Sequence, residues 1–337
     1  MKPVFFSYYG AGKGEIAMKK RLAATALACA ALVLCACSQR IGTNAADSAQ
    51  PLKLPAKVQL REDGEPMLNV YLTDEEKTET QPLEEYLCGV LAGEMRSDWP
   101  MEALKAQAIL ARTFVLKFME EKESRYPGAD ISTDIEEAQA YDAAAVNDRI
   151  RQAVRDTRGQ VLVSDGALIY AWFHAHSGGV TAGAKEGLNW KAAEPRYIRT
   201  AEGRESASAP AEAQAWQAAF SAEEIIRAAN AAGAAVKTVE GARIGERGAS
   251  GRAVTLVFGG VPVNAADFRI ALGSTKMRST LLTNLAEENG YIEMEGKGYG
   301  HGVGMSQWGA YGQAEVGATA EEIVLSYFQN VEVVKAY

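Results

Sequence analysis

The amino-acid sequence predicts an α+β fold in which strands and helices are mixed along the chain. Strand-like runs occur early and late, helices with apolar residues three or four positions apart lie between them, and no segment is repeated. A doubly wound sheet would require strands and helices in regular alternation, which this chain of 337 residues lacks. The mixed class is therefore favoured.

The first elements expected in the fold are two strands and a helix. Residues 58–60 and 67–72 have the composition of strands around an acidic turn. A helix follows, because Thr80 can cap it and Pro82 suits its first turn. The residues at helical spacing on its apolar stripe are Leu83, Leu87, Val90 and Glu94.

A longer second helix is expected to begin near residues 98–100. Lys105 and Arg112 are seven residues apart, and seven residues make about two helical turns, so both lie on one flank of this helix. Its apolar stripe consists of Leu104, Ala108, Ala111, Val115 and Phe118.

The rest of the chain adds shorter elements. A strand pair is expected at 161–163 and 167–173, and a loop or insertion at 201–215. The segment from about 201 to 290 is expected to form an inserted smaller subdomain. The remaining expected elements are a helix at 223–232, a strand at 253–258, a helical piece at 267–272, a strand at 291–294 and a final helix at 320–328.

The N-terminal segment has the features of an export signal. Residues 1–17 are expected to be an upstream misreading, because Met18 is followed by three basic residues and an apolar run. Residues 18–36 then form a lipoprotein signal peptide, with small Ala36 at the cut and Cys37 as the residue that carries lipid. A membrane-spanning anchor is the alternative, although the run is short for a hydrocarbon core of ~30 Å.

Both alternatives place the folded part outside the cytoplasm, and the first anchors it to the cell membrane by lipid. Residues 37–56 are small and polar and are expected to be a tether to a domain at 57–337. Cys88 is the only cysteine in that domain, so its stability must come from a hydrophobic core. The formal net charge of −8 repels nucleic acid, which is therefore excluded as an expected partner.

Glu94 occupies a position where the helical pattern predicts a core residue. Its carboxyl group should be partly desolvated, which raises its pKa and suits a general acid that works near neutral pH. The alternative is a glutamate at a helix end that faces solvent or pairs with Lys105 or Arg112.

His174 and His176 follow an alternating apolar segment, so both imidazoles are expected on one face of a strand. They could share a metal ion if a third ligand came from elsewhere, and His301 is the only other histidine. The alternative is a pair of polar residues in a cleft, and no metal or other cofactor is expected because soft ligands are few.

The stretch GYGHGVGMSQWGAYG at 298–312 contains six glycines and neither pattern of a nucleotide-binding loop. One alternative is a glycine-rich turn that leads into a helix near Ser306. The other is a sugar site, in which polar groups bind hydroxyls and an indole covers a ring face. The side chains available for such a site are His301, Ser306, Gln307 and Trp308.

These segments together resemble the stage II sporulation protein D family, whose domain is also called amidase-enhancer or LytB-type. The resemblance runs from about residue 58 to the end, in the order of the family, and it implies an α+β fold with a glycan-binding cleft. The segments that carry it are LEEYLCGVLAGEMRSDWPMEALKAQAILART at 83–113, HAHSGGVT at 174–181, SGRAVTL at 250–256, FRIALGSTKMRST at 268–280 and GYGHGVGMSQWGAYGQAEVG at 298–317.

The best-known member of that family is a lytic transglycosylase, which cuts peptidoglycan glycan strands stripped of their peptides. The resemblance implies this activity here, with Glu94 of the GEM segment as the catalyst. Such an enzyme needs one carboxyl group, which protonates the bridging oxygen and then takes a proton from the C6 hydroxyl of the sugar. That hydroxyl closes onto C1 and leaves a 1,6-anhydro-muramyl end, whereas ordinary glycosidases use two carboxylates.

The resemblance also implies supporting roles. Lys105 and Arg112 would hold the lactyl carboxylate of muramic acid. His174, His301, Ser306 and Gln307 would line the sugar cleft, and the glycines between them would let the backbone approach the glycan. Some relatives bind zinc beside the middle motif through cysteine and histidine, but that segment has no cysteine here.

Two other functions stay open at this point. The second family name suggests a non-catalytic module that binds peptidoglycan and stimulates a partner N-acetylmuramoyl-L-alanine amidase. A metal-dependent hydrolase that uses His174 and His176 is the third hypothesis. The biological setting is either engulfment in sporulation or ordinary remodelling of the cell wall.

Overall fold

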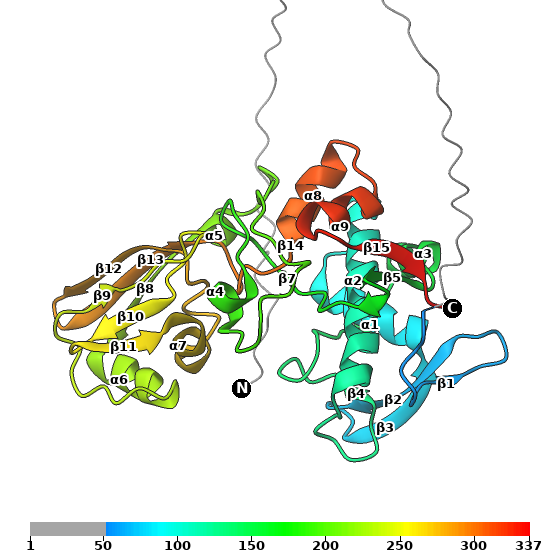
Figure 1. Ribbon diagram of the computed structural model, residues 1–337, viewed down its shortest axis with the longest axis horizontal. Coiled ribbons are helices and arrows are strands. Elements are labelled where there is room, and N and C mark those ends of the chain that lie inside the picture. The colour runs from blue at the N-terminus through cyan, green and yellow to red at the C-terminus, as the bar shows by residue number, and fades with distance from the viewer. Residues whose placement is uncertain (1–51) are drawn as a thin grey trace, which may run out of the picture. The chain divides into compact units, whose positions relative to one another are not determined.

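The computed structural model describes residues 52–337 of the chain (Figure 1). The expected start at Met18, the signal peptide at 18–36, the lipidated Cys37 and nearly all of the tether lie outside these residues. Within them the chain is a mixed α+β protein, as the sequence predicts, with a main core and a second core. No helix in the described range has both the length and the apolar character needed to cross a bilayer.

A small sheet precedes the long helices. Strands β1 and β3 pair antiparallel with β2, and β4 pairs parallel with β2. Thr80, which was expected to cap the next helix, donates a hydrogen bond to Asn69 across the sheet instead, and the helix begins after Pro82 without a side-chain cap. The bounds are β1 (Gln59–Leu60), β2 (Pro66–Leu72), β3 (Lys77–Pro82) and β4 (Ile131–Ser132).

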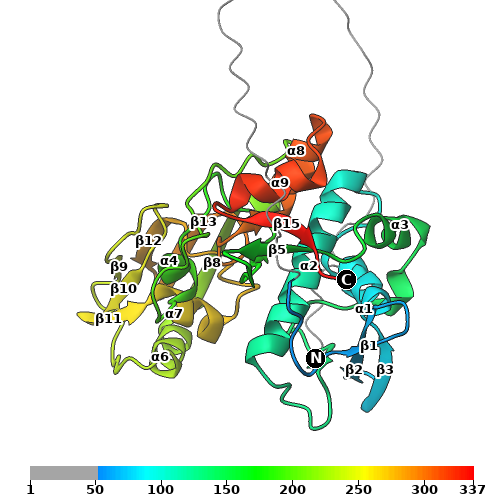
Figure 2. The ribbon, with the colours of Figure 1, turned by 45° about the vertical axis from the view of Figure 1, so that its right-hand side comes forward.

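Helix α2 is the centre of the main core. It is buried along most of its length, as expected for a helix that is apolar on most sides. Its neighbours include α1, α3, α8, α9 and β5, and Figure 2 shows α8 and α9 near one end of it. The bounds are α1 (Leu83–Glu94), α2 (Met101–Glu121), α3 (Asp148–Asp156), α8 (Gln307–Glu315) and α9 (Ala320–Tyr327), with a 3₁₀ turn at Ala143–Ala145.

Two further sheets join distant parts of the chain. Strand β5 lies between β6 and β15 and pairs antiparallel with both, so the last strand packs beside the middle of the chain. Strand β7 pairs parallel with β14, which brings His174 opposite Ser306. The bounds are β5 (Gln160–Ser164), β6 (Ala167–Leu168), β7 (Phe173–His174), β14 (Met305–Ser306) and β15 (Glu332–Lys335).

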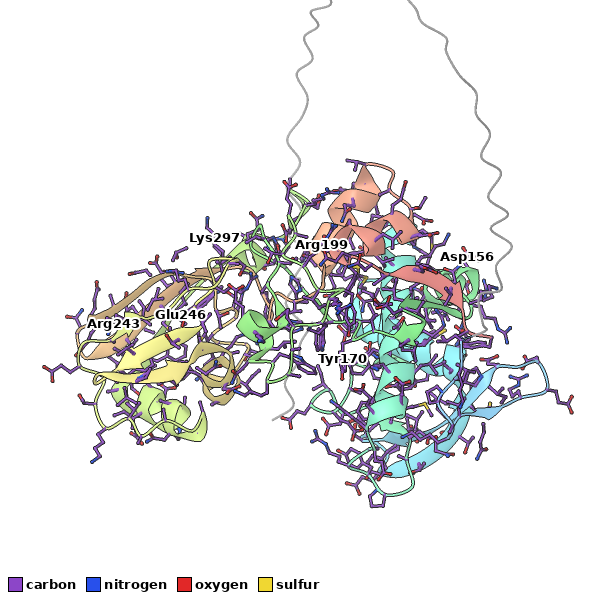
Figure 3. All side chains as sticks on the ribbon, viewed as in Figure 1. Asp156, Tyr170, Arg199, Arg243, Glu246 and Lys297 are labelled. Carbon is purple, nitrogen blue, oxygen red and sulfur yellow. The ribbon has the colours of Figure 1, made fainter. Side chains whose placement is uncertain are left out.

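The single strand expected at 167–173 is interrupted, because β6 and β7 are separate elements. Between them Tyr170 and Trp172 stack with their ring centroids 5.0 Å apart, and Trp190 packs edge-on against both rings. The Tyr170 hydroxyl donates to Glu121 of α2, and Figure 3 places Tyr170 beside that helix. The segment with these rings therefore lies between two sheets, since β6 pairs with β5 and β7 pairs with β14.

The second core is formed by residues from Trp216 to Met294. Two antiparallel sheets, ordered β12-β13-β8 and β11-β10-β9, pack with α6 and α7 (Figure 1). Phe220, Phe258 and Ile292 in this core are almost completely buried. The bounds are α4 (Ala184–Leu188), α5 (Ala211–Gln214), β8 (Ala215–Ser221), α6 (Ala222–Ala231), β9 (Arg243–Ile244), β10 (Thr255–Phe258), β11 (Val261–Asn264), α7 (Ala265–Leu272), β12 (Leu282–Glu288) and β13 (Tyr291–Lys297).

Candidate active site

Glu94 is the last residue of α1, and two donors from distant parts of the chain hold its carboxylate. The backbone N–H of Ala140 donates to Oε1 at 2.8 Å. The Nε2 of Gln307 donates to Oε2 at 3.3 Å and to the carbonyl oxygen of Glu94 at the same distance. Gln307 is the first residue of α8, so the C-terminal end of one helix meets the N-terminal end of another.

Two glycines of α1 allow the segment that carries Ala140 to approach. A Cβ on Gly93 would lie 2.6 Å from the backbone nitrogen of Tyr141, and a Cβ on Gly89 would lie 2.2 Å from its ring. The Tyr141 ring also stacks on Tyr86, with 5.5 Å between the centroids. The segment is therefore fixed against α1, and its N–H has a fixed direction toward Glu94.

The pKa of Glu94 is raised to about 7, chiefly because the carboxyl group is desolvated, while the hydrogen bonds from Ala140 and Gln307 act in the opposite direction. The free carbonyl groups at the end of α1 also disfavour a negative charge there. Glu94 remains partly exposed, so a ligand can reach it. Such a carboxyl group can give and take a proton near neutral pH.

Lys105 does not neutralise Glu94. Its Nζ lies 3.0 Å from Glu102 and 3.1 Å from Asp156, and its side chain is 21% exposed. The hydrogen bond to Glu102 raises the pKa of Lys105. Two protein carboxylates therefore already bind this ammonium group. The expected contact between it and a substrate carboxylate stays a prediction.

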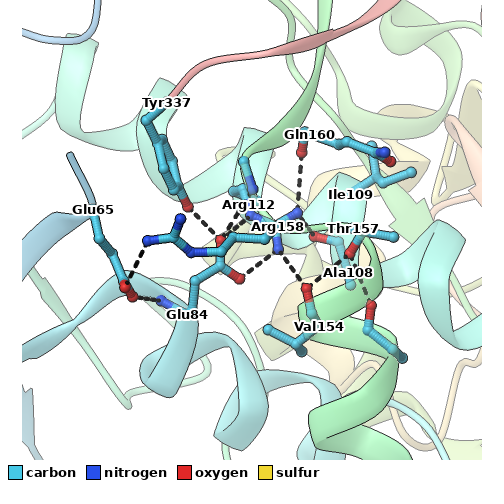
Figure 4. A network of polar contacts seen from close by, with 12 residues as sticks. Glu65, Glu84, Ala108, Ile109, Arg112, Val154, Thr157, Arg158, Gln160 and Tyr337 are labelled. Carbon is cyan, nitrogen blue, oxygen red and sulfur yellow. Dashed lines mark hydrogen bonds and ion pairs between the residues drawn. The ribbon is translucent and has the colours of Figure 1, made fainter. Parts of the chain in front are cut away.

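Arg112 is fully buried at the centre of a polar network (Figure 4). Its Nε and Nη2 donate to the two carboxylate oxygens of Glu84 at 2.9 and 2.6 Å, and its Nη1 donates to the carbonyl of Gln160 at 3.0 Å. Glu84 also accepts hydrogen bonds from the N–H of Gly159 and the hydroxyl of Tyr337. This position contradicts the expectation that Arg112 holds a substrate carboxylate, because its charged group is not accessible.

His301 and His174 form a second polar group, with their ring centroids 5.7 Å apart. The Nδ1 of His301 accepts from the N–H of Val303, and the Nδ1 of His174 lies 3.2 Å from the carbonyl oxygen of Val303. Desolvation and the charges of Arg269 and Arg252 lower the pKa of His301 to about 3. Burial also lowers the pKa of His174, so both rings are neutral near pH 7. His174 is 4% exposed, which contradicts the expectation that it lines a sugar cleft, whereas His301 is partly exposed and can be reached by a ligand.

Ser306 joins the glycine-rich stretch to the middle motif. Its hydroxyl donates to Oε1 of Glu205 at 3.1 Å, and the N–H of Ser177 donates to the same oxygen at 2.8 Å. Ser306 also caps α8, because its hydroxyl accepts from the N–H of Gly309. The side chain is fully buried, which contradicts the expectation that it lines a sugar cleft. It instead fixes the start of α8 and hence the direction of Gln307.

The glycines of the same stretch make room for the protein itself. A Cβ on Gly300 would lie 2.6 Å from the Cβ of His174, and one on Gly304 would lie 2.0 Å from the carbonyl oxygen of Trp172. Both glycines have positive φ angles, +112° and +72°, which disfavour other residues. Close packing between the two motifs explains these glycines without a ligand.

His176 belongs to a different backbone pairing from His174, since it bridges to Tyr299. Its Nδ1 accepts a hydrogen bond from the N–H of Gly178 at 3.0 Å. Within residues 52–337, no three or more His, Cys, Asp or Glu side chains are grouped so that they could hold a metal ion.

Three aromatic rings lie where α2 and α8 begin. The Trp99 ring centroid is 4.5 Å from that of Trp308 and 5.1 Å from that of Tyr311. Trp99 is buried, whereas the other two rings are partly exposed. The sequence pattern points to Trp308 as a possible sugar contact but to neither Trp99 nor Ala140. A Trp-Pro pair before a helix is a usable signal for Trp99, but Ala140 contributes a backbone amide, which no residue type marks.

The sequence is similar to those of known proteins. Residues 71–163 match a family model described as "Stage II sporulation protein", and these residues include Glu94 and Ala140. The chain is 32% identical over 280 residues to the "Stage II sporulation protein D" of Bacillus amyloliquefaciens, an alignment that covers 79% of this chain and 78% of that protein.

The chain aligns with different fractions of two other relatives. An uncharacterized protein of Brachyspira hyodysenteriae is 35% identical over 256 residues, which are 75% of this chain and 66% of that protein. The "Amidase enhancer" of Bacillus subtilis (strain 168) is 26% identical over 288 residues, which are 72% of this chain but 39% of that protein. The chain thus spans about two thirds of the first protein's length and about two fifths of the second's.

Proposed function

The chain belongs to the stage II sporulation protein D family, and from that premise we propose that it is a peptidoglycan lytic transglycosylase in which Glu94 is both general acid and general base. Family membership supports a role connected with the cell wall in sporulation. The observation that carries the finer proposal is the Glu94 carboxyl group, which has a pKa of about 7 and is held by two neutral donors.

The proposed reaction uses this one group twice. Oε1 accepts from a backbone N–H at 2.8 Å, so the proton of the neutral acid is carried by Oε2. Oε2 gives that proton to the oxygen between two sugars as the bond to C1 breaks. The resulting carboxylate takes a proton from the C6 hydroxyl, whose oxygen bonds to C1 and closes a 1,6-anhydro ring. No water is consumed, and Glu94 is protonated again at the end.

The hydrogen bonds serve the second half of this sequence. Ala140 and Gln307 donate to the carboxylate when it is charged, which stabilises it until it removes the sugar proton. Desolvation supports the first half, because it keeps the acid protonated up to about pH 7. Trp308 and His301 are partly exposed and are the residues of the glycine-rich stretch that we propose to contact the glycan.

The expected setting of this activity is the outer side of the cell membrane. We propose that the protein is exported and anchored by lipid on Cys37, on the strength of the N-terminal sequence.

The test of the proposed function is digestion of peptidoglycan glycan from which the peptides have been removed by an amidase. Mass spectrometry of the products should find 1,6-anhydro-muramyl ends and no new reducing ends. Untreated peptidoglycan is the control and should be cut more slowly. Reducing ends without the anhydro product would contradict the proposal and would indicate ordinary hydrolysis.

A second candidate function is supported by the name "Amidase enhancer" of one relative. In this function the protein binds peptidoglycan and stimulates a partner N-acetylmuramoyl-L-alanine amidase without cutting glycan. Intact glycan in the digestion, together with faster peptide release when a cell-wall amidase is added, would favour this candidate over the first.

Gln307→Leu is expected to shift the pH profile of glycan cleavage. The wild-type kcat/KM should fall as pH rises through about 7, because the first step needs the protonated acid. The hydrogen bond from Gln307 lowers the pKa of Glu94, so its loss should move this descending limb to higher pH and reduce the maximal rate roughly 10-fold, about 1.4 kcal/mol.

The matched control is Gln313→Leu, which changes the same residue type in the same helix and instead removes a bond to the carbonyl of Gly309 and one from Arg204. Its pH profile should coincide with that of the wild-type protein. Equal shifts in both variants would mean that the effect comes from altered packing of α8 and not from Glu94.

A further inference from the structure

The second core ends in an open strand edge that the proposed reaction does not use. Strand β8 (Ala215–Ser221) is the outer strand of the sheet β12-β13-β8 and pairs on one side only, with β13. The N–H of Gly298 donates to the carbonyl of Gln214, which fixes the alternation along the ladder. By that alternation the N–H and C=O groups of Gln217 and Ala219 and the C=O of Ala215 face away from β13, while the N–H of Ala215 donates to the carbonyl of Ala211 at the end of α5.

The side chains on this edge do nothing to block another strand. Ala215, Gln217 and Ala219 are exposed and uncharged, and the register with β13 has no bulge. Proteins usually protect an open edge with charged residues, proline, a bulge or a very short strand. A seven-residue edge without any of these is expected to be covered by a partner.

Other outer strands of the described part carry such protection. Strand β12 has a register irregularity and exposes Glu287 and Glu288, β11 contains Pro262, and β3 exposes Lys77 and Glu79. Strands β1, β6 and β9 have only two residues each. Among these outer strands of residues 52–337, the edge of β8 is therefore an exception.

A slot of about 410 Å³ is lined by residues 215–220 of β8 together with Glu212, Thr275, Lys276 and Arg278. Lys276 is mostly exposed and makes one ion pair with Glu224 at 3.3 Å. Arg278 lies 5.4 Å from the ring centroid of Tyr299 and donates to the backbone carbonyl of Glu212. The slot has two cations and one carboxylate in its lining, although the chain as a whole has a net charge of −8.

We propose that the edge of β8 binds an extended, acidic segment of a partner protein, which adds to the sheet as a further strand. The outward main-chain groups of β8 bond the backbone of that segment, and Lys276 and Arg278 attract its carboxylates. A second copy of this chain fits less well, because pairing β8 with itself would bring two sets of these cations together. The proposal is independent of the glycan-cleaving function.

The test uses a seven-residue fluorescent peptide in which glutamate alternates with valine, added to the full chain in an anisotropy titration. It should bind with a Kd in the micromolar range, and the affinity should fall at high salt. A peptide with lysine in place of glutamate, and an acidic peptide N-methylated at alternate residues, should each bind at least 10-fold more weakly. Equal binding of either control peptide, or no binding of the acidic one, would overturn the proposal.

Ala219→Pro supplies the test on the protein side. The N–H of Ala219 faces away from β13, so proline there removes one outward donor without breaking the ladder. Circular dichroism and glycan cleavage should be unchanged, while the affinity for the acidic peptide falls at least 10-fold. Unchanged affinity would overturn the proposal, as would sedimentation of the wild-type protein as a dimer that this variant converts to a monomer.

Discussion

Glu94→Gln is expected to lower kcat/KM for peptide-free glycan by about 10³-fold or more. One carboxyl group performs both proton transfers in the proposed reaction, and an amide can perform neither. Binding of the glycan should change little, because glutamine keeps the shape of the side chain and its oxygen can still accept from the N–H of Ala140, although its NH2 group cannot accept from Gln307. The measurement is the rate of formation of 1,6-anhydro-muramyl ends, with Glu123→Gln as an exposed control that should retain full activity.

The same variant should also change how stability depends on pH. The pKa of Glu94 in the folded protein, about 7, is above its ordinary value of 4.5, so the carboxyl group favours folding below pH 4.5 relative to higher pH. That contribution is lost as pH rises through 7. Glutamine does not titrate. The stability of Glu94→Gln relative to the wild type should therefore rise between pH 4.5 and pH 7, by at most about 3 kcal/mol, and stay at that level at higher pH.

Urea unfolding at pH 5 and pH 8 measures this difference. A gain that is larger at pH 8 supports a desolvated acid, and the Glu123→Gln control should show no such change. Equal stability of wild type and Glu94→Gln at both pH values would mean that the carboxyl group is solvated. Retained anhydro-forming activity in Glu94→Gln would remove the proposed catalyst altogether.

Arg112→Met is expected to destabilise the fold by about 3–5 kcal/mol, because it leaves the carboxylate of Glu84 without its cation in a place where only 13% of that side chain is exposed. Lys105→Met, the matched control on the same flank of α2, should cost about 1 kcal/mol or less. Midpoints of urea unfolding measure both effects.

A further variant separates burial of a charge from loss of packing. Glu84→Gln combined with Arg112→Met removes both charges and should recover part of the lost stability. The opposite pattern, in which Arg112→Met folds normally but raises KM for the glycan, would restore the original expectation that Arg112 binds substrate.

The sequence predicts the α+β class, most of the helices and the position of Glu94, because the spacing of apolar residues reports which face of an element is buried. It does not report what covers that face. Lys105 and Arg112 share a flank of α2. Lys105 is partly exposed and pairs with Glu102, whereas Arg112 is enclosed by Glu84 and the backbone of residues 154 and 160.

The donors to Glu94 could not be predicted for a different reason. One is a backbone amide, at Ala140, and the other lies 213 positions away, at Gln307. Tertiary structure alone brings these groups together. The strand expected around Tyr170 is wrong because the alternation of this segment is typical of a strand, while its rings pack with Trp190 and α2 instead.

The separation of Glu94 from Gln307 has a consequence for the order of folding. A segment with a hydrophobic core of its own lies between them in the chain, so the hydrogen bond between Glu94 and Gln307 spans 213 positions and is expected to form late. A fragment that stops before α8 would retain α1 and its glutamate but lack the amide that completes its environment. If the proposed reaction holds, activity should therefore appear only after the C-terminal part has folded.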